Sequence, residues 1–260
     1  MIEALLFDLD DTLYLESDFV ASGYRAVARF IGARRGMGHE EILYTMMRTF
    51  TAHGRRAVLP RVIDRYLDAS VTVADLVEIY RNHGPRIRLL PGYGPLLRRL
   101  GRRHRLGILT DGLPEVQERK VTALGLGKIV DDVVYTWKQG PERQKPDPAG
   151  FLALLERFGT DPARALYVGD NPDKDCAGAH RAGMKFVQVA GRQVRPGPTR
   201  EGGAAEFVIE NLHQLPGVLA LLEGAAGERT RAARRSGPRR TRDAATQRTS
   251  AERRLMEAVV

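Results

Sequence analysis

Short apolar runs recur along the chain and are separated by longer segments in which apolar residues have helical spacing. Most of these runs are rich in Leu, Ile and Val without alternation, which is typical of strands covered on both faces. Strands that alternate with helices predict an α/β fold with a Rossmann-like, doubly wound parallel sheet. The six predicted strands are residues 3–7, 105–110, 132–136, 165–169, 185–189 and 206–209.

Proline and glycine mark the ends of two predicted helices in the second half of the chain. Pro114 suits the first position of a helix, where its missing N–H is not needed, and Gly125 suits the C-terminal end. Asp147, followed by a proline, opens a second helix that ends near Gly159. These helices fit the crossovers that a parallel sheet requires.

One long interval, between Leu15 and Gly84, contains no strand pattern. Thr72 and Asp75 have the spacing of a capping box at the start of its last helical segment. We therefore predict a helical subdomain at residues 15–84, inserted into an α/β core of residues 1–14 and 85–222. The predicted helical segments are residues 17–33, 40–53, 59–69 and 72–83.

The formal net charge is +9, and much of it lies near the end of the chain. Residues 223–260 contain ten arginines and five acids, with few large apolar residues and no helical stripe. This composition predicts a basic, disordered tail. The alternative is an arginine-rich arm that binds nucleic acid or an acidic partner through its charge.

Cysteine content and the N-terminus bear on the cellular location. Cys176 is the single cysteine, so the chain has no intramolecular disulfide, and we expect this residue to be buried. The sequence MIEALLFDLD lacks the basic start of a signal peptide, and no apolar run approaches the roughly 18 residues of a membrane span. We therefore expect a cytoplasmic protein without a membrane partner.

Polar residues follow the predicted strands at the edge where the carboxyl ends of parallel strands form a ligand crevice. Carboxylates cannot approach a phosphoryl group unaided, but a hard cation such as Mg²⁺ offsets the repulsion. A lysine, a hydroxyl and backbone N–H groups suit the remaining phosphate oxygens. The residues are Asp8 and Asp10 after the first strand, Thr110 and Asp111 after the second, Lys145 before a helix, and Asp170 after the fourth strand.

The segment FDLDDTLY places three carboxylates within four positions. Asp8 and Asp10 are two residues apart, so in extended chain they point the same way and can address one substrate. One can serve as a nucleophile and its neighbour as a proton carrier. Asp11 points elsewhere, and we expect it to stabilise a turn or a helix start, while Thr12 fixes the turn.

In their order along the chain, these residues resemble the four motifs of the haloacid dehalogenase superfamily of phosphohydrolases. The resemblance covers roughly residues 1–220 and excludes the basic tail. The motifs are D-x-D-x-T with Asp8, Asp10 and Thr12, a strand that ends in Thr110, Lys145 before a proline, and the acid pair of VGDNPDKD with Asp170 and Asp175.

The resemblance implies a role for each matching residue. Asp8 attacks phosphorus to form an aspartyl-phosphate, and Asp10 acts as general acid and then as general base. Thr110, Lys145 and the backbone N–H of Asp111 hold the phosphoryl oxygens.

The resemblance also implies a Mg²⁺ ion bound by Asp8, the backbone carbonyl of Asp10, and Asp170, with Asp175 in contact with the ion or next to it. Asp173 is a second candidate in the fourth motif, and we favour Asp175 because it begins the following helix. Residues 15–84 match the position of the family's cap of the first type, which reads the leaving group. The implied substrate is a small phosphorylated metabolite, such as a nucleotide or a sugar phosphate.

Three other functions use similar residues. A phosphomutase would return the phosphate to its substrate, whereas a 2-haloacid dehalogenase needs neither a second acid nor a metal, so Asp10 and VGDNPDKD argue against it. A phosphoacceptor signalling module of the receiver type belongs to another class of protein. The helical insert directly after the first strand argues against that class.

Overall fold

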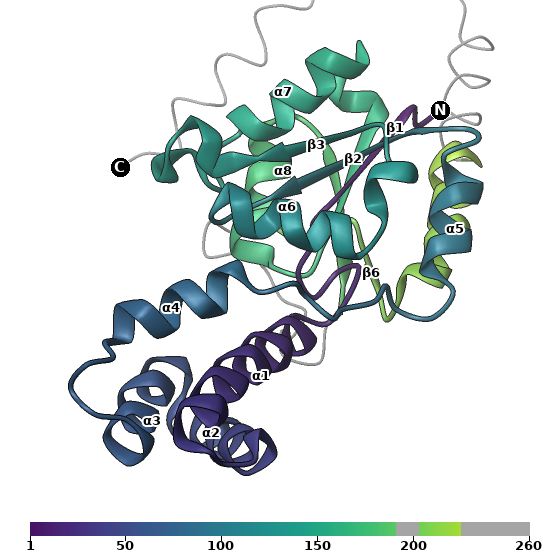
Figure 1. The fold of residues 1–260 in the computed structure, drawn as a ribbon. Helices are drawn as coiled ribbons and strands as arrows, with labels where there is room; N and C mark the ends of the chain where they lie inside the picture. The colour runs from purple at the N-terminus through teal and green to yellow at the C-terminus, as the bar shows by residue number, and fades with distance from the viewer. Residues whose placement is uncertain (191–202, 225–260) are drawn as a thin grey trace, which may run out of the picture. The chain divides into compact units, whose positions relative to one another are not determined.

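The structure, a computed structural model, describes residues 1–190 and 203–224. One sheet of six parallel strands has the order β3-β2-β1-β4-β5-β6 (Figure 1). All six predicted strands are confirmed, with small shifts at their ends. Their bounds are Ala4–Phe7 for β1, Arg105–Thr110 for β2, Asp132–Tyr135 for β3, Ala165–Gly169 for β4, Lys185–Val189 for β5 and Phe207–Ile209 for β6.

Helices cover both faces of the sheet, with α6 on one face and α8 on the other (Figure 1). The predicted doubly wound α/β fold is therefore confirmed. Pro114 is the first residue of α6, and Gly125 and Gly159 adopt the left-handed conformation just beyond α6 and α7. The bounds are Tyr93–Leu100 for α5, Pro114–Ala123 for α6, Ala149–Phe158 for α7 and Ala177–Arg181 for α8.

Helix α5 was not predicted. Gly94 and Pro95 near its start are poor helix formers and interrupt the sequence pattern. The helix nevertheless buries Leu96, Leu97 and Leu100, and burial of one such side chain contributes about 1.5–3 kcal/mol. Tertiary packing therefore outweighs the weak local propensity.

The inserted segment forms four helices with an apolar cluster of their own (Figure 1). Val27, Ile31, Met46 and Leu76 are fully buried in this cluster. The predicted capping box is present, since the backbone N–H of residue 75 donates to the Thr72 hydroxyl and the N–H of residue 72 donates to the Asp75 carboxylate. The bounds are Glu16–Arg35 for α1, His39–His53 for α2, Val58–Tyr66 for α3 and Val73–Asn82 for α4.

Residues 1–219 form one compact unit, which contains the sheet and the inserted helices. Of the second unit, residues 220–260, only residues 220–224 are described, and they are helical. The predicted basic tail therefore lies almost wholly outside the described residues. Within residues 1–190 and 203–224, no helix is long and apolar enough to cross a membrane.

The strand order creates a switch point between β1 and β4. From β1 the chain builds the sheet in one direction through β2 and β3, and it then crosses to β4 on the other side of β1. Ligands bind at such points because the two connections diverge and leave a crevice. Asp8 directly follows β1, and its backbone N–H donates to the carbonyl oxygen of Val168 at 2.9 Å. Asp170 directly follows β4, so the fold brings both acids to this crevice.

Candidate active site

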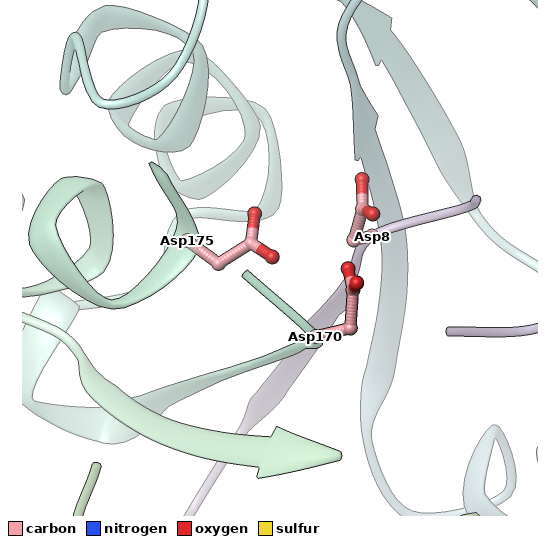
Figure 2. Close-up of side chains that lie close together, drawn as sticks. All are labelled: Asp8, Asp170 and Asp175. Carbon is pink, nitrogen blue, oxygen red and sulfur yellow. The ribbon is translucent and has the colours of Figure 1, made fainter. Parts of the chain in front are cut away.

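Three carboxylates meet at the switch point. Asp8 comes from the end of β1, Asp170 from the end of β4, and Asp175 from a helical turn over Pro172–Cys176. One oxygen from each carboxylate lies within 4.8 Å of one from each of the others. Figure 2 shows the three side chains grouped around a common point. Such a set of hard oxygen donors is chemically suited to Mg²⁺.

Lys145 links two of these acids from the buried side of the cluster. Its Nζ lies 2.6 Å from Asp8 Oδ1 and 2.7 Å from Asp175 Oδ1, and it also donates to the hydroxyl of Tyr167 at 3.1 Å. All three donors of the ammonium group are thereby occupied. Burial lowers the pKa of Lys145, but the charges of Asp175 and Asp8 outweigh it and raise the pKa well above its ordinary value. The lysine therefore stays charged.

Tyr167 supports Lys145 and was not predicted as a site residue. Its hydroxyl accepts from Lys145 and donates to the backbone carbonyl of Leu109 at 3.1 Å. The ring is fully buried and packs edge-to-face against Phe151 at 4.7 Å between ring centroids. The only signal in the sequence is a single phenol within the apolar run ALYVG. That signal does not reveal which buried group the hydroxyl contacts.

The crowding of the acids raises the pKa of two carboxyl groups. Burial raises the pKa of Asp8 well above its ordinary value, and repulsion from Asp175 and Asp170 adds to this effect, although Lys145 opposes it. Burial, followed by repulsion from Asp175, raises the pKa of Asp170 to about 7. One lysine therefore does not offset three carboxylates, and a divalent cation would supply the missing positive charge.

Gly169 makes room for the acid cluster. A Cβ atom at this position would collide with the carboxylate of Asp175. The Asp175 carboxylate also accepts the backbone N–H of Asn171 at 3.0 Å, which anchors it above the strand end. The glycine in VGDNPDKD is thus required by the close approach of the side chain six residues later.

Asp10 has a separate set of partners. Lys120 Nζ donates to both oxygens of its carboxylate, at 2.7 and 2.9 Å, and the amide of Gln117 donates to Oδ2 at 3.0 Å. The Tyr14 hydroxyl donates to Oδ1. Burial alone would raise the pKa of Asp10, but the charge and hydrogen bonds of Lys120 outweigh it, so the pKa lies below its ordinary value.

Lys120 and Gln117 were also not predicted. They lie three positions apart on one face of α6, and both are buried. The Gln117 amide also donates to the hydroxyl of Thr110 at 2.5 Å. Gln117 therefore connects the end of β2 to Asp10.

Asp111 holds the loop that carries Lys145. Its carboxylate accepts the hydroxyl of Thr136 at 2.9 Å and the backbone N–H of Lys145 at 3.0 Å. Lys174 lies 3.3 Å from its other oxygen. The sequence prediction considered only the backbone N–H of Asp111, so this contribution of the side chain is an additional finding.

The other residues of the first and fourth motifs differ in outcome. Asp11 Oδ1 accepts the backbone N–H of Glu16, the first residue of α1, at 2.8 Å, which confirms its predicted role at a helix start. The expectation that Asp11 points away from the site is wrong, because this residue lines the same polar cavity as Asp8 and its charge helps to raise the pKa of Asp170. Thr12 does not hold the turn as expected, because its buried hydroxyl has no hydrogen-bond partner among the described residues. Asp175 rather than Asp173 belongs to the acid cluster. Cys176 is fully buried, as predicted.

All seven residues nominated from the sequence line one polar cavity of about 290 Å³. The cavity lies where β1, β2 and β4 end. The fold therefore gathers residues that are up to 167 positions apart, although their individual roles stay predictions. These residues are Asp8, Asp10, Thr110, Asp111, Lys145, Asp170 and Asp175.

The doubly wound sheet carries an acid cluster and a buried lysine at its switch point, an arrangement that is suited to a metal ion and a phosphate group. A family model described as haloacid dehalogenase-like hydrolase matches residues 2–183 of this chain. The chain therefore belongs to the haloacid dehalogenase-like hydrolase family, as its four motifs predict.

Proteins with similar sequences include phosphatases. The chain is 30% identical over 227 residues to a glyceraldehyde 3-phosphate phosphatase of Methanopyrus kandleri, which covers 83% of this chain and 96% of that protein. It is 34% identical over 143 residues to a phosphoserine phosphatase of Thermus thermophilus, which covers 55% and 56% of the two chains.

Among solved structures, a 2-haloacid dehalogenase from Pseudomonas syringae pv. Tomato has a similar fold. The TM-score is 0.60 with 27% sequence identity, and the match covers 85% of this chain and all of that one. The fold is thus shared by enzymes that act on different bonds, and the choice between reactions rests on the site.

Proposed function

We propose that this chain is a Mg²⁺-dependent phosphatase that removes phosphate from a small phosphorylated metabolite through an aspartyl-phosphate on Asp8. The observation that carries this proposal is the contact of Asp8 with Lys145, at 2.6 Å, inside a cluster with Asp170 and Asp175. The names of the relatives support it, since glyceraldehyde 3-phosphate and phosphoserine are small phosphate monoesters.

In the first half of the proposed reaction, an oxygen of Asp8 forms a bond to phosphorus, and the bond between phosphorus and the leaving oxygen breaks. Asp10 gives its proton to that oxygen, so the product leaves as an alcohol. Lys145, the Thr110 hydroxyl and the backbone N–H of residue 111 are the candidate donors to the phosphoryl oxygens. Because all three ammonium donors of Lys145 are occupied, a phosphoryl oxygen must replace one of its present acceptors. The Thr110 hydroxyl and the backbone N–H are held at the strand end, and their fixed positions favour the transition state.

In the second half, water attacks the phosphorus of the aspartyl-phosphate while Asp10 takes the proton from that water. The bond from phosphorus to Asp8 breaks, and inorganic phosphate and the free carboxylate are restored. In the described arrangement Lys120 holds Asp10 as a carboxylate, which suits it to act as this base. The earlier proton donation requires that the Lys120 contact loosen when substrate arrives.

Asp8, Asp170 and Asp175, together with the backbone carbonyl of Asp10, are the groups proposed to hold Mg²⁺. The ion would supply positive charge that lets the phosphate approach the three carboxylates. The shared geometry of the three carboxylates and the raised pKa values of Asp8 and Asp170 support this assignment, since carboxylates without a cation would be costly to crowd in a buried site.

We further propose that residues 15–84 act as a cap over this site, with a core of residues 1–14 and 85–222. Glu16 from α1 lines the polar cavity, which supports a position of the insert beside the acids. The cytoplasmic location and the unstructured, basic character of residues 223–260 stay predictions from the sequence.

The test is turnover of a generic phosphate ester. Purified protein with Mg²⁺ should release inorganic phosphate from p-nitrophenyl phosphate, and chelation with EDTA should stop the reaction until Mg²⁺ is restored. The variant Asp8→Asn should be inactive while its circular dichroism spectrum is unchanged. Asp18→Asn, at an exposed aspartate in the first turn of α1, is the matched control and should retain activity.

The same assay separates the alternatives. A phosphomutase would isomerise its substrate without net release of phosphate, and a receiver module would not turn over. A dehalogenase would release halide from a 2-haloacid and would be insensitive to EDTA. Full activity of the Asp8→Asn variant would contradict the proposed mechanism.

A further inference from the structure

A second cavity, of about 470 Å³, adjoins the polar one. The two share Asp10, Glu16 and Asp111 in their walls, so a molecule bound at the acid cluster can extend from one into the other. The second cavity has the size of sites that take metabolites or drug-sized ligands, which are typically about 300–1,000 Å³. It is therefore large compared with a three-carbon leaving group.

The walls of this second cavity are mostly apolar. The inserted helices contribute Phe19, Leu59 and Val77, and the core contributes Leu113 and Val116. A short, hydroxylated leaving group would leave most of these side chains in contact with water. A longer apolar group would displace that water, and this favours binding in proportion to the apolar area that is covered.

Phe19 marks the end of the cavity nearest the acids. The ammonium of Lys120 lies 4.4 Å from the centre of the Phe19 ring, and the same ammonium holds Asp10. Tyr24 is five residues further along α1, which corresponds to about 7.5 Å along the helix axis. Tyr24 thus lies on the part of the wall that is more distant from the phosphoryl position.

Two hydroxyls of the cavity wall lack partners, those of Tyr24 and of Tyr80, whose ring lies 5.8 Å from the Phe19 ring. The side chains of Tyr24 and Tyr80 both line the cavity, with ring centroids 5.6 Å apart. Each phenol oxygen is shielded from solvent and has no hydrogen-bond partner among the described residues. Buried donors without a partner are unfavourable, so an acceptor oxygen brought by a ligand would satisfy them.

The positive charge near these phenols also favours a ligand that carries an acceptor oxygen. Burial raises the pKa of both Tyr24 and Tyr80, so each remains a protonated donor. Arg55 lines the same cavity, and its positive charge acts on both phenols. Arg55 also forms an ion pair with Glu16 at 2.8 Å, which keeps the guanidinium at this wall.

We propose that this second cavity selects phosphate monoesters whose leaving group is an apolar chain or ring with an acceptor oxygen at the end distant from the phosphate. The selection of this substrate class rests on the proposed phosphatase function. Tyr24 and Tyr80 are the residues that recognise the acceptor, and Phe19, Leu59 and Val77 contact the apolar body.

The first test is a chain-length series with Mg²⁺ present. Ethyl, butyl and hexyl phosphate have similar alkoxide leaving groups, so differences in kcat/KM report contact with the cavity. Each added methylene should raise kcat/KM roughly fourfold. Glyceraldehyde 3-phosphate should be a poorer substrate than hexyl phosphate. Equal rates along the series, or a preference for glyceraldehyde 3-phosphate, would overturn the proposed selectivity.

The second test concerns the two phenols. A hexyl phosphate that carries a terminal carboxylate should be preferred over plain hexyl phosphate by about tenfold, as expected for a hydrogen bond to a charged group. The variants Tyr24→Phe and Tyr80→Phe should abolish this preference without changing kcat/KM for ethyl phosphate. Tyr44→Phe is the matched control, since Tyr44 is 63% exposed and does not line this cavity.

Binding of alkyl phosphonates, which cannot be hydrolysed, separates the two proposals. Calorimetric affinities that rise with chain length would support the selectivity even if no ester were cleaved, and that combination would overturn only the phosphatase function. If all esters are hydrolysed and the phosphonate affinities do not depend on chain length, only the selectivity would be overturned. Persistence of the terminal carboxylate preference in both Tyr→Phe variants would overturn the role of the phenols.

Discussion

Asp8 and Asp10 are two residues apart in the chain, but their surroundings differ in almost every respect. Asp8 belongs to a cluster of three acids, shares Lys145 with one of them, Asp175, and has a raised pKa. Asp10 forms an ion pair with a different lysine, Lys120, and its pKa is lowered. A carboxylate in a crowded acid cluster needs additional positive charge, whereas one paired with its own lysine does not. The two acids therefore differ in the charge that surrounds them, which supports the different roles proposed for them.

The largest expected effect comes from removing the shared lysine. In Lys145→Met, the buried carboxylates of Asp8 and Asp175 lose their common partner, which should lower the free energy of unfolding by about 3–5 kcal/mol. The loss of a fixed donor should reduce kcat by about 10²–10³. Denaturant titration and steady-state kinetics measure the two effects. Lys128→Met, at an exposed lysine that does not line the polar cavity, should change both quantities much less.

Removal of the other lysine should instead change the pH dependence. Lys120 lowers the pKa of Asp10, so Lys120→Met should raise it. If Asp10 is the base of the second half-reaction, the acidic limb of the pH profile of kcat should move upward by about 1–3 pH units. Lys138→Met, at an exposed lysine paired with Glu118, should leave the profile in place. An unmoved limb in Lys120→Met would contradict the assignment of Asp10 as this base.

A smaller effect should follow from removing the hydroxyl that supports Lys145. Tyr167→Phe keeps the packing of the ring but leaves one ammonium donor and the Leu109 carbonyl without their partner. The free energy of unfolding should fall by about 1–3 kcal/mol. A role in positioning predicts that kcat falls while KM changes little, whereas a purely structural role predicts normal kinetics in the fraction that is folded. Kinetics at a temperature well below Tm distinguish the two.

The smallest expected effect is the dependence of metal binding on pH. The pKa of Asp170 is raised to about 7, so its contribution to stability is present at low pH and is lost as pH rises through that value. Mg²⁺ needs the carboxylates deprotonated and offsets their repulsion. The increase in Tm caused by Mg²⁺ should therefore be larger near about pH 8 than near about pH 5. In Asp170→Asn this difference should shrink.

Several features of the fold were accessible from the sequence. Uninterrupted apolar runs mark buried parallel strands, and polar residues directly after them mark the ligand edge. Asp8, Thr110 and Asp170 could be nominated in this way because each directly follows or ends such a run. The inserted helices were predicted because their apolar residues recur with helical spacing and lack strand patterns.

Other parts of the site could not be predicted, because they depend on contacts between distant segments. Lys120 and Asp10 are 110 positions apart, and nothing in the sequence of α6 shows that its buried polar face covers the first motif. The Tyr167 hydroxyl contacts Lys145, which lies 22 positions away in the chain and on a different element. Helix α5 forms in spite of Gly94 and Pro95 because of its packing.

The sequence by itself determined the order of strands and helices along the chain and the residues that end each strand, because periodicity and polarity are local properties. Only the tertiary structure decided that Asp8 shares a lysine with Asp175 while Asp10 has one of its own. The sign of a pKa shift depends on burial and on the charges within a few ångströms, and those neighbours come from separate elements. The different surroundings of these two aspartates, which are only two residues apart, are therefore a property of the fold.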